Sequence, residues 1–459
     1  MSLAFAFALI VLIGAAFYLG QGRALRQRDV GGARMHSLPS YYGFYAAIWC
    51  ALPAAALIAL WAASQGAIVE ALVLSGVEDE IRGLTENQIG LVMNDIRNLA
   101  SGGITSSDPS PAIQAAAARY ANLMATGKLA MFVVALALAS AGLLFAFRRI
   151  SPDLRARNRV ERTLMIALML SSTIAILVTV GIVFSLVFEA ARFFARVPIT
   201  EFVFGLKWSP QIAIRADQVG SSGAFGAIPV FAGTLLISFI AMCVAAPIGL
   251  FSAIYMAEYA SRKFRAVVKP VLEILAGIPT VVYGFFAALT VAPTLRDMGA
   301  TLGLDVASES ALAAGVVMGI MIIPFVSSLS DDVINAVPQA MREGSFGLGA
   351  THSETVRKVV LPAALPGIVG AFLLAVSRAI GETMIVVMAA GLAANLTANP
   401  FAAVTTVTVQ IVTLLTGDQE FDSPKTLAAF ALGLLLFVVT LGLNVIALRV
   451  VRKYREQYD

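Results

Sequence analysis

Charged residues are scarce in this sequence. Asp, Glu, Lys and Arg make up 13% of its 459 residues, whereas hydrophobic residues make up 59%. A soluble domain carries about 25% charged residues. The apolar residues also occur in blocks of about 20, the length that a helix needs to cross a bilayer. These features exclude an ordinary soluble domain and predict an all-α, polytopic membrane protein.

Cysteine and histidine are also rare, with only Cys50, Cys243, His36 and His352. Isolated residues of these types form neither a disulfide framework nor a metal site. The Gly-x4-Gly-Lys-Ser/Thr phosphate loop is missing too, since the segment 126–129 reads Thr-Gly-Lys-Leu. We therefore expect a protein that is not an enzyme, has no nucleotide site of its own, and needs no cofactor, metal or nucleic acid partner.

The apolar blocks predict about nine membrane-spanning helices. We expect them near residues 2–20, 43–63, 128–147, 163–189, 230–257, 270–293, 311–330, 364–391 and 426–448. The first block resembles a signal peptide in length. Its positive charges, however, follow the apolar run at Arg23, Arg26 and Arg28, whereas in a signal peptide they precede it. We expect this helix to be retained.

Lys and Arg between the blocks predict the orientation. The loops 21–42, 148–162, 258–269 and 331–363, with the tail from residue 449 onward, hold 21 basic residues, and the alternate loops hold 9. Basic loops stay in the cytoplasm. This pattern predicts a multi-pass membrane protein with its N-terminus outside and its C-terminus in the cytoplasm. The basic segment 148–162 divides a three-helix N-terminal extension, 1–150 with a long outer loop at 64–127, from a six-helix core, 163–459.

Two opposite charges stand inside an apolar run, in the sequence Ser377-Arg378-Ala379-Ile380-Gly381-Glu382-Thr383-Met384. Arg378 and Glu382 are the only charges between residues 361 and 417. Charge is costly in hydrocarbon, so intramembrane ionisable residues commonly mark a transport path. In a continuous helix, residues four apart share a face. Arg378 then offers a fork of donors that suits an oxyanion, with Glu382 as its partial counterion and Ser377 and Thr383 as hydroxyl neighbours. A purely structural ion pair is the alternative.

The longest cytoplasmic loop predicts a helical hairpin. Pro338 suits a first helical turn and Gly349 suits the end of that helix. Thr351 and Glu354 have the spacing of a capping box for a second helix, which we expect to stop before Pro362.

This loop resembles the EAA loop of permease subunits of ATP-binding cassette (ABC) importers, E-A-A-x3-G-x9-I-x-L-P. The matching residues are Glu343, Gly344, Ser345, Gly349, Val359, Leu361 and Pro362. Gly344 and Ser345 replace two alanines, and Val359 replaces isoleucine. The resemblance implies a type I ABC-importer permease, with the transmembrane domain at about 230–448. It also implies a coupling loop at 338–362 that docks on an ATPase through Glu343, Gly344, Ser345, Gly349, Leu361 and Pro362.

Further segments resemble the PstC-type permease of the bacterial phosphate importer, in its long form with an N-terminal extension. They are 232–260, 275–286, 377–384 and the C-terminal 423–459. The resemblance implies inorganic phosphate as substrate and the bacterial cell inner membrane as the location. It also implies a second, PstA-like permease, an ATPase dimer and a periplasmic phosphate-binding protein as partners, within the lipid bilayer. Two alternatives stay open: a permease for molybdate, sulfate or phosphonate, and a gradient-driven anion transporter.

Overall fold

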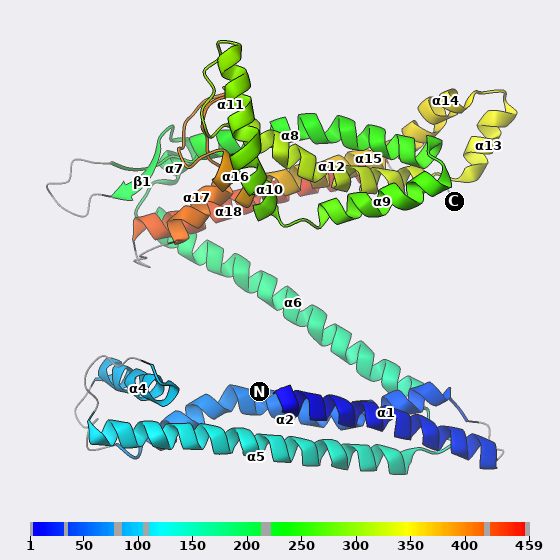
Figure 1. Ribbon diagram of the computed structural model, residues 1–459, viewed down its shortest axis with the longest axis vertical. Helices are drawn as coiled ribbons and strands as arrows, with labels where there is room; N and C mark the ends of the chain where they lie inside the picture. The colour runs from blue at the N-terminus through cyan, green and yellow to red at the C-terminus, as the bar shows by residue number, and fades with distance from the viewer. Residues whose placement is uncertain are drawn as a thin grey trace. The chain divides into compact units, whose positions relative to one another are not determined.

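The computed structural model describes residues 3–31, 35–77, 85–103, 110–212, 222–416 and 423–454. The predicted loops 21–42, 64–127, 190–229 and 392–425, and the tail after residue 449, each include positions outside these ranges. The described part is predominantly helical, as expected (Figure 1). It also contains one antiparallel pair of short strands, β1 (Trp208–Ile212) and β2 (Ser222–Phe225), which the sequence analysis did not predict.

The chain forms two compact units, residues 1–176 and 177–459, with α6 (Ala156–Phe194) continuing from the first into the second. In the first unit three long helices lie side by side, α1 (Leu3–Gly31), α2 (Pro39–Leu74) and α5 (Pro111–Arg149) (Figure 1). The predicted outer loop 64–127 is largely helical within the described residues, because α2 and α5 extend beyond the predicted spans and α4 (Glu86–Ser101) lies between them.

Helices α2 and α5 approach closely where Gly142 faces the backbone of Trp49, a position at which any side chain would collide with the Trp49 carbonyl oxygen. Buried small residues on the same helices, Ala46, Ala135 and Ala139, also allow this packing. Because lipid gives no hydrophobic drive for helix association, such close backbone contact is the usual source of attraction between membrane helices.

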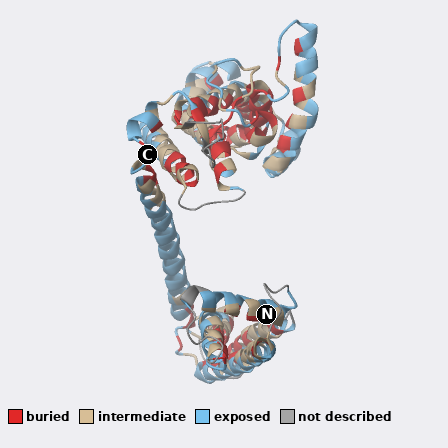
Figure 2. Ribbon diagram, turned by 90° about the vertical axis from the view of Figure 1, so that its left-hand side faces the viewer, coloured by how far each residue is buried: buried red, intermediate tan, exposed pale blue. Residues whose placement is uncertain are grey.

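The second unit is built on α8 (Ile228–Ile254) and α12 (Ala311–Asn335). Its other long helices are α15 (Leu361–Ile380) and α18 (Pro424–Tyr454). Gly315 and Gly319 of α12 face Ile240 and Val244 of α8 at distances that leave no room for a Cβ. The G-x-x-x-G pair therefore serves close packing, as its spacing predicts. A buried core surrounds this crossing, and the apolar outer faces of the bundle stay exposed for lipid (Figure 2).

The predicted span 270–293 is not one straight helix. Two helices, Arg262–Ala276 (α9) and Thr280–Thr301, meet at an angle of 86° around Gly277 and Pro279. The second consists of α10 (Thr280–Phe286), a π-helical turn η2 (Ala287–Val291) and α11 (Ala292–Thr301). Pro279 ends the first helix, because its ring excludes the preceding residues from continuing the helical path. The described residues thus contain eight helices long and apolar enough to cross a membrane, or nine if the bent pair counts as one.

Helix α9 buries none of its side chains, and charged contacts attach it to α12 instead. The fully buried Asp331 accepts hydrogen bonds from Arg265 Nη2 at 2.8 Å and Lys269 Nζ at 3.1 Å. Asn335 Nδ2 donates to the other carboxylate oxygen at 2.9 Å. The paired cations offset the cost of burying this carboxylate.

Candidate functional site

Arg378 lies in the last turn of α15, immediately before a break in the backbone. The helix ends at Ile380, and α16 (Met384–Ala389) begins after Thr383. The Glu382 carboxylate causes the new start, because its Oε1 accepts the N–H of Met384 at 3.0 Å and that of Ile385 at 3.4 Å. A carboxylate at this position satisfies exposed N–H groups and suits the positive end of a helix. The predicted continuous helix over 364–391 is therefore wrong.

The break also separates Arg378 from Glu382. Their predicted pairing required an unbroken helix, in which residues four apart face the same side. Instead, Glu382 is engaged by backbone N–H groups, and Arg378 forms no ion pair with any carboxylate in the described ranges. The prediction that Glu382 acts as the direct counterion of Arg378 is wrong.

The Arg378 side chain is exposed and lies against Phe325 of α12, with its Cζ 5.6 Å from the ring centroid. A guanidinium stacked on an aromatic face keeps its in-plane N–H donors available. Ser377 and Thr383, on either side of the break, are half-buried. The arrangement presents a cation with free donors at a helix end, which suits an anionic group with several oxygens.

A polar network that the sequence analysis missed holds the break. Thr408 Oγ1, at the start of α17 (Val407–Leu415), donates to the Glu382 carbonyl at 2.8 Å. Two residues further along α17, the Gln410 amide donates to the Leu392 carbonyl at 3.0 Å and accepts from Trp208 Nε1 of β1 at 2.8 Å. The only sequence signal for it is a glutamine within the apolar run of α17.

The chain between α16 and α17 folds back over the start of α12. Gly391 has a φ of +99°, a left-handed conformation that glycine adopts without strain. Beyond this turn, the Pro400 and Ala402 carbonyls accept the N–H groups of Leu312 and Ala311 at 2.8 and 3.1 Å. This return closes the end of the bundle that also carries β1 and β2, whereas the predicted coupling hairpin lies at the other end of the second unit (Figure 1).

The predicted coupling hairpin consists of α13 (Gln339–Gly347) and α14 (His352–Thr355). Gly349, in the turn, has a φ of +83°. The predicted capping box is confirmed, since Glu354 Oε2 accepts the Thr351 N–H at 3.0 Å and Thr351 Oγ1 accepts the Glu354 N–H at 3.4 Å. Ser345 also joins the two helices, through a hydroxyl contact of 2.9 Å with Thr355.

The prediction that the second hairpin helix stops before Pro362 is wrong. It passes through a π-helical turn, η3 (Val356–Val360), into α15, and one helical segment runs from His352 to Ile380. In that turn the Leu361 N–H reaches back five residues to Val356. This shift in hydrogen bonding lets the helix continue through a proline that has no N–H to donate. Leu361 and Pro362 therefore lie at the start of α15.

A buried ion pair fixes the hairpin to α8. Glu258, in the π-helical turn η1 (Tyr255–Tyr259) that ends α8, has a side chain only 5% exposed. Its Oε1 accepts from Arg342 Nη1 at 2.6 Å, and Arg342 Nη2 donates to the Ile334 carbonyl at 2.8 Å. His352 Nε2 lies 3.8 Å from the other oxygen of Glu258. The pair therefore holds the hairpin to the end of α8, because breaking it would leave a buried charge without a partner.

The tip of the hairpin is apolar and unoccupied by any other described part of the chain. Leu348 is 92% exposed and Phe346 is 42% exposed. The predicted coupling residues Glu343, Gly344 and Gly349 are exposed on the same hairpin, and Ser345 is half-buried. Exposed apolar side chains on a rigid, polar-rimmed element are typical of a protein contact.

Two family models match the chain. Residues 6–178 match a model described as a phosphate ATP-binding cassette transporter, and residues 245–456 match the inner membrane component of binding-protein-dependent transport systems. The first match covers the three-helix unit and the start of α6. The second covers the hairpin and the break that carries Arg378.

The alignments with curated relatives cover most of each relative's own length. The probable ABC transporter permease YqgH of Bacillus subtilis is 32% identical, over 62% of this chain and 86% of the relative. The phosphate transport system permease PstC of Mesorhizobium japonicum is 34% identical, over 49% of this chain and 72% of the relative. PstC 1 of Mycobacterium tuberculosis is 36% identical, over 50% of this chain and 73% of the relative. These matches and the multi-pass helical architecture show that the chain belongs to the PstC-type family of ABC transporter permeases.

Proposed function

We propose that this chain is the transmembrane subunit of an ATP-driven importer that moves inorganic phosphate from the periplasm into the cytoplasm. The observation that carries the proposal is its similarity, at 34% and 36% identity, to permeases that are named for phosphate transport. The exposed Arg378 guanidinium, at a helix break and with free donors, supports the same cargo. Its planar fork matches phosphate oxygens and stays charged at any physiological pH.

The partners follow from the family. An ABC permease works with a second permease subunit, an ATPase pair and a substrate-binding protein, here a PstA-like chain and a phosphate-binding protein. The hairpin tip at Leu348 and Phe346 is the surface that we assign to the ATPase. This assignment places the hairpin in the cytoplasm, with the N-terminus outside and the C-terminus inside, in agreement with the basic loops.

The connection from ATPase to substrate has two routes. Closure of the ATPase pair would push the hairpin, and the Glu258–Arg342 pair would pass that displacement to the end of α8. The helical segment from His352 to Ile380 would carry it to Arg378. Both routes connect the coupling loop to the bundle by rigid elements, as alternating access requires.

We assign Arg378, Ser377 and Thr383 to the phosphate path, with Glu382 at its edge. A carboxylate beside an anion path would repel the substrate. Glu382 avoids this by directing Oε1 at two backbone N–H groups, which stabilise its negative charge. Its role in the path is to fix the helix break that positions Arg378.

The function is tested by uptake of radiolabelled phosphate into cells or proteoliposomes that contain the chain with its three kinds of partner. Uptake is expected to need ATP and the binding protein, and an excess of unlabelled phosphate should suppress it far more than sulfate, molybdate or phosphonate does. Stronger suppression by one of those anions would assign the transporter to that anion. Uptake that persists without an ATPase subunit would reject the importer and favour a gradient-driven transporter.

Substitutions of Glu382 test whether its side chain is needed to cap α16 or to supply a negative charge. In Glu382→Gln the amide oxygen can still accept from Met384 and Ile385, so phosphate uptake is expected to stay within about twofold of wild type. Glu382→Ala removes the cap, which costs about 1 kcal/mol, and uptake should fall further. Equal, severe losses in both variants at normal membrane levels would show that the charge itself is required.

A further inference from the structure

A cavity of about 460 Å³ lies between α2 and the first turns of α6, entirely within residues 1–176. Its walls are apolar and come from both helices. They include Trp49, Leu52, Pro53, Ile166, Ala167 and Leu170. The apolar side chains of α6 beyond the cavity are exposed, so the cavity continues into a lipid-facing surface (Figure 2). An apolar chain can enter it without desolvating any polar group.

Two arginines, Arg159 and Arg162, are among the residues that line the same cavity. Arg159 contacts Tyr45, with Nη1 3.4 Å from the phenolic oxygen and Cζ 5.9 Å from the ring centroid. The nearest acid in the sequence, Glu161, is already engaged by Arg157 at 2.6 Å. Neither Arg159 nor Arg162 has a carboxylate partner among the residues that the structure describes.

Hydrogen bonds tie the start of α6 and the segment before it to the region around the start of α2. Tyr42 donates its hydroxyl to the Leu154 carbonyl at 3.0 Å, and the Arg157 N–H donates to Ser37 Oγ at 3.2 Å. Ala156 and Val160 are buried against this region. Arg159 and Arg162 are thus carried by a helix whose start is anchored, and not by a loop.

We propose that this cavity binds an anionic phospholipid. The lipid phosphate accepts hydrogen bonds from Arg159 and Arg162, and one acyl chain lies along the apolar walls. A basic pocket between membrane helices has the chemistry for an acidic lipid headgroup. Arginine favours phosphate because its fork of donors can contact two oxygens at once. Free phosphate would satisfy only the cationic end, and a neutral lipid would leave both cations without a counterion.

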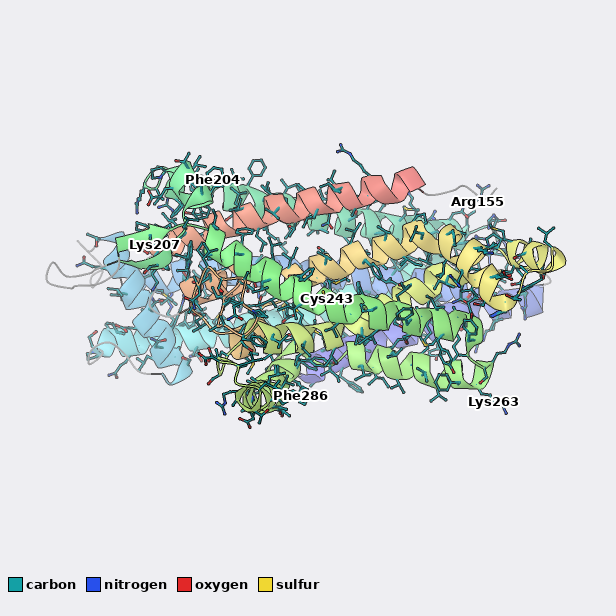
Figure 3. The ribbon with its side chains drawn as sticks, turned by 90° about the horizontal axis from the view of Figure 1, so that it is seen from above. Arg155, Phe204, Lys207, Cys243, Lys263 and Phe286 are labelled. Atoms are coloured by element: carbon teal, nitrogen blue, oxygen red, sulfur yellow. The ribbon has the colours of Figure 1, made fainter. Side chains whose placement is uncertain are left out.

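Native mass spectrometry of the full-length chain, purified in mild detergent and supplied with phosphatidylglycerol or phosphatidylcholine, tests the site. Wild type is expected to retain phosphatidylglycerol in preference to phosphatidylcholine. The double variant Arg159→Gln/Arg162→Gln should retain at least about tenfold less phosphatidylglycerol, because it loses both charge-assisted contacts with the lipid phosphate. Arg155→Gln, an exposed arginine outside the cavity lining (Figure 3), is the matched control and should behave as wild type.

A second variant tests the apolar part of the cavity independently of the two arginines. Ala167→Trp keeps both arginines but fills the cavity, and it should also lose phosphatidylglycerol. Full retention of phosphatidylglycerol in Ala167→Trp would overturn the proposal, as would equal retention of the two lipids by wild type. Displacement of the lipid by inorganic phosphate alone would also overturn it, because the site would then be one for free anions.

Discussion

Replacing Arg378 with glutamine is expected to lower phosphate uptake by about tenfold or more, because one charge-assisted hydrogen bond contributes about 1.5–3 kcal/mol. The guanidinium is the only charge on the described part of α15 and lies against Phe325 without a carboxylate partner. Its loss therefore removes the attraction for an anion without exposing a buried acid. The measurement is the initial rate of radiolabelled phosphate uptake at matched levels of assembled transporter.

Two controls accompany this variant. Arg378→Lys keeps the charge but loses the planar fork, so it should fall between wild type and Arg378→Gln. Phe325→Leu keeps the guanidinium but removes the ring on which it lies, and a smaller loss is expected. Wild-type uptake by an assembled Arg378→Gln transporter would contradict a role in the phosphate path. ATPase activity stimulated by the binding protein should persist in all three variants, since none alters the hairpin.

Replacing Leu348 with aspartate is expected to reduce recovery of the ATPase with this chain by about tenfold or more. Burying a leucine side chain contributes about 1.5–3 kcal/mol, and burying an unpaired carboxylate at the same point opposes binding further. Leu348 is 92% exposed, so the chain's own fold does not depend on it. The measurement is the amount of ATPase that co-purifies with the tagged permease in mild detergent.

Leu302→Asp is the matched control for this prediction. Leu302 is 72% exposed and follows α11, away from the hairpin (Figure 1). The substitution adds the same charge and removes the same side chain, and ATPase recovery should stay unchanged. An equal loss in both variants would point to a general defect in assembly. Normal recovery in Leu348→Asp would exclude the hairpin tip as the ATPase contact.

Much of the architecture could be predicted from local sequence. Apolar runs of about 20 residues identify membrane helices because lipid satisfies no backbone hydrogen bonds. The hairpin followed from equally local rules, with Thr351 and Glu354 forming the predicted box and Gly349 the predicted turn. The close approach at Gly315 and Gly319 also followed from spacing alone.

The candidate site could be predicted in part only. Arg378 stood out because a cation is costly in an apolar run, but nothing local showed that Glu382 would cap a new helix. The break is also held from a distance, because Thr408, 26 positions away, donates to the Glu382 carbonyl. The Glu258–Arg342 pair joins residues 84 positions apart. Contacts of this range arise from tertiary packing, which periodicity and spacing do not encode.

Under the proposed coupling, the continuous helical segment from His352 to Ile380 would act as a lever. Its 29 residues span about 40 Å at 1.5 Å per residue. A tilt of about 5° around its middle would shift its two ends by about 2 Å in opposite directions, as follows from that length. A shift of about 2 Å is enough to make or break a hydrogen bond. A small stroke at the hairpin is therefore sufficient to change what the Arg378 guanidinium can hold.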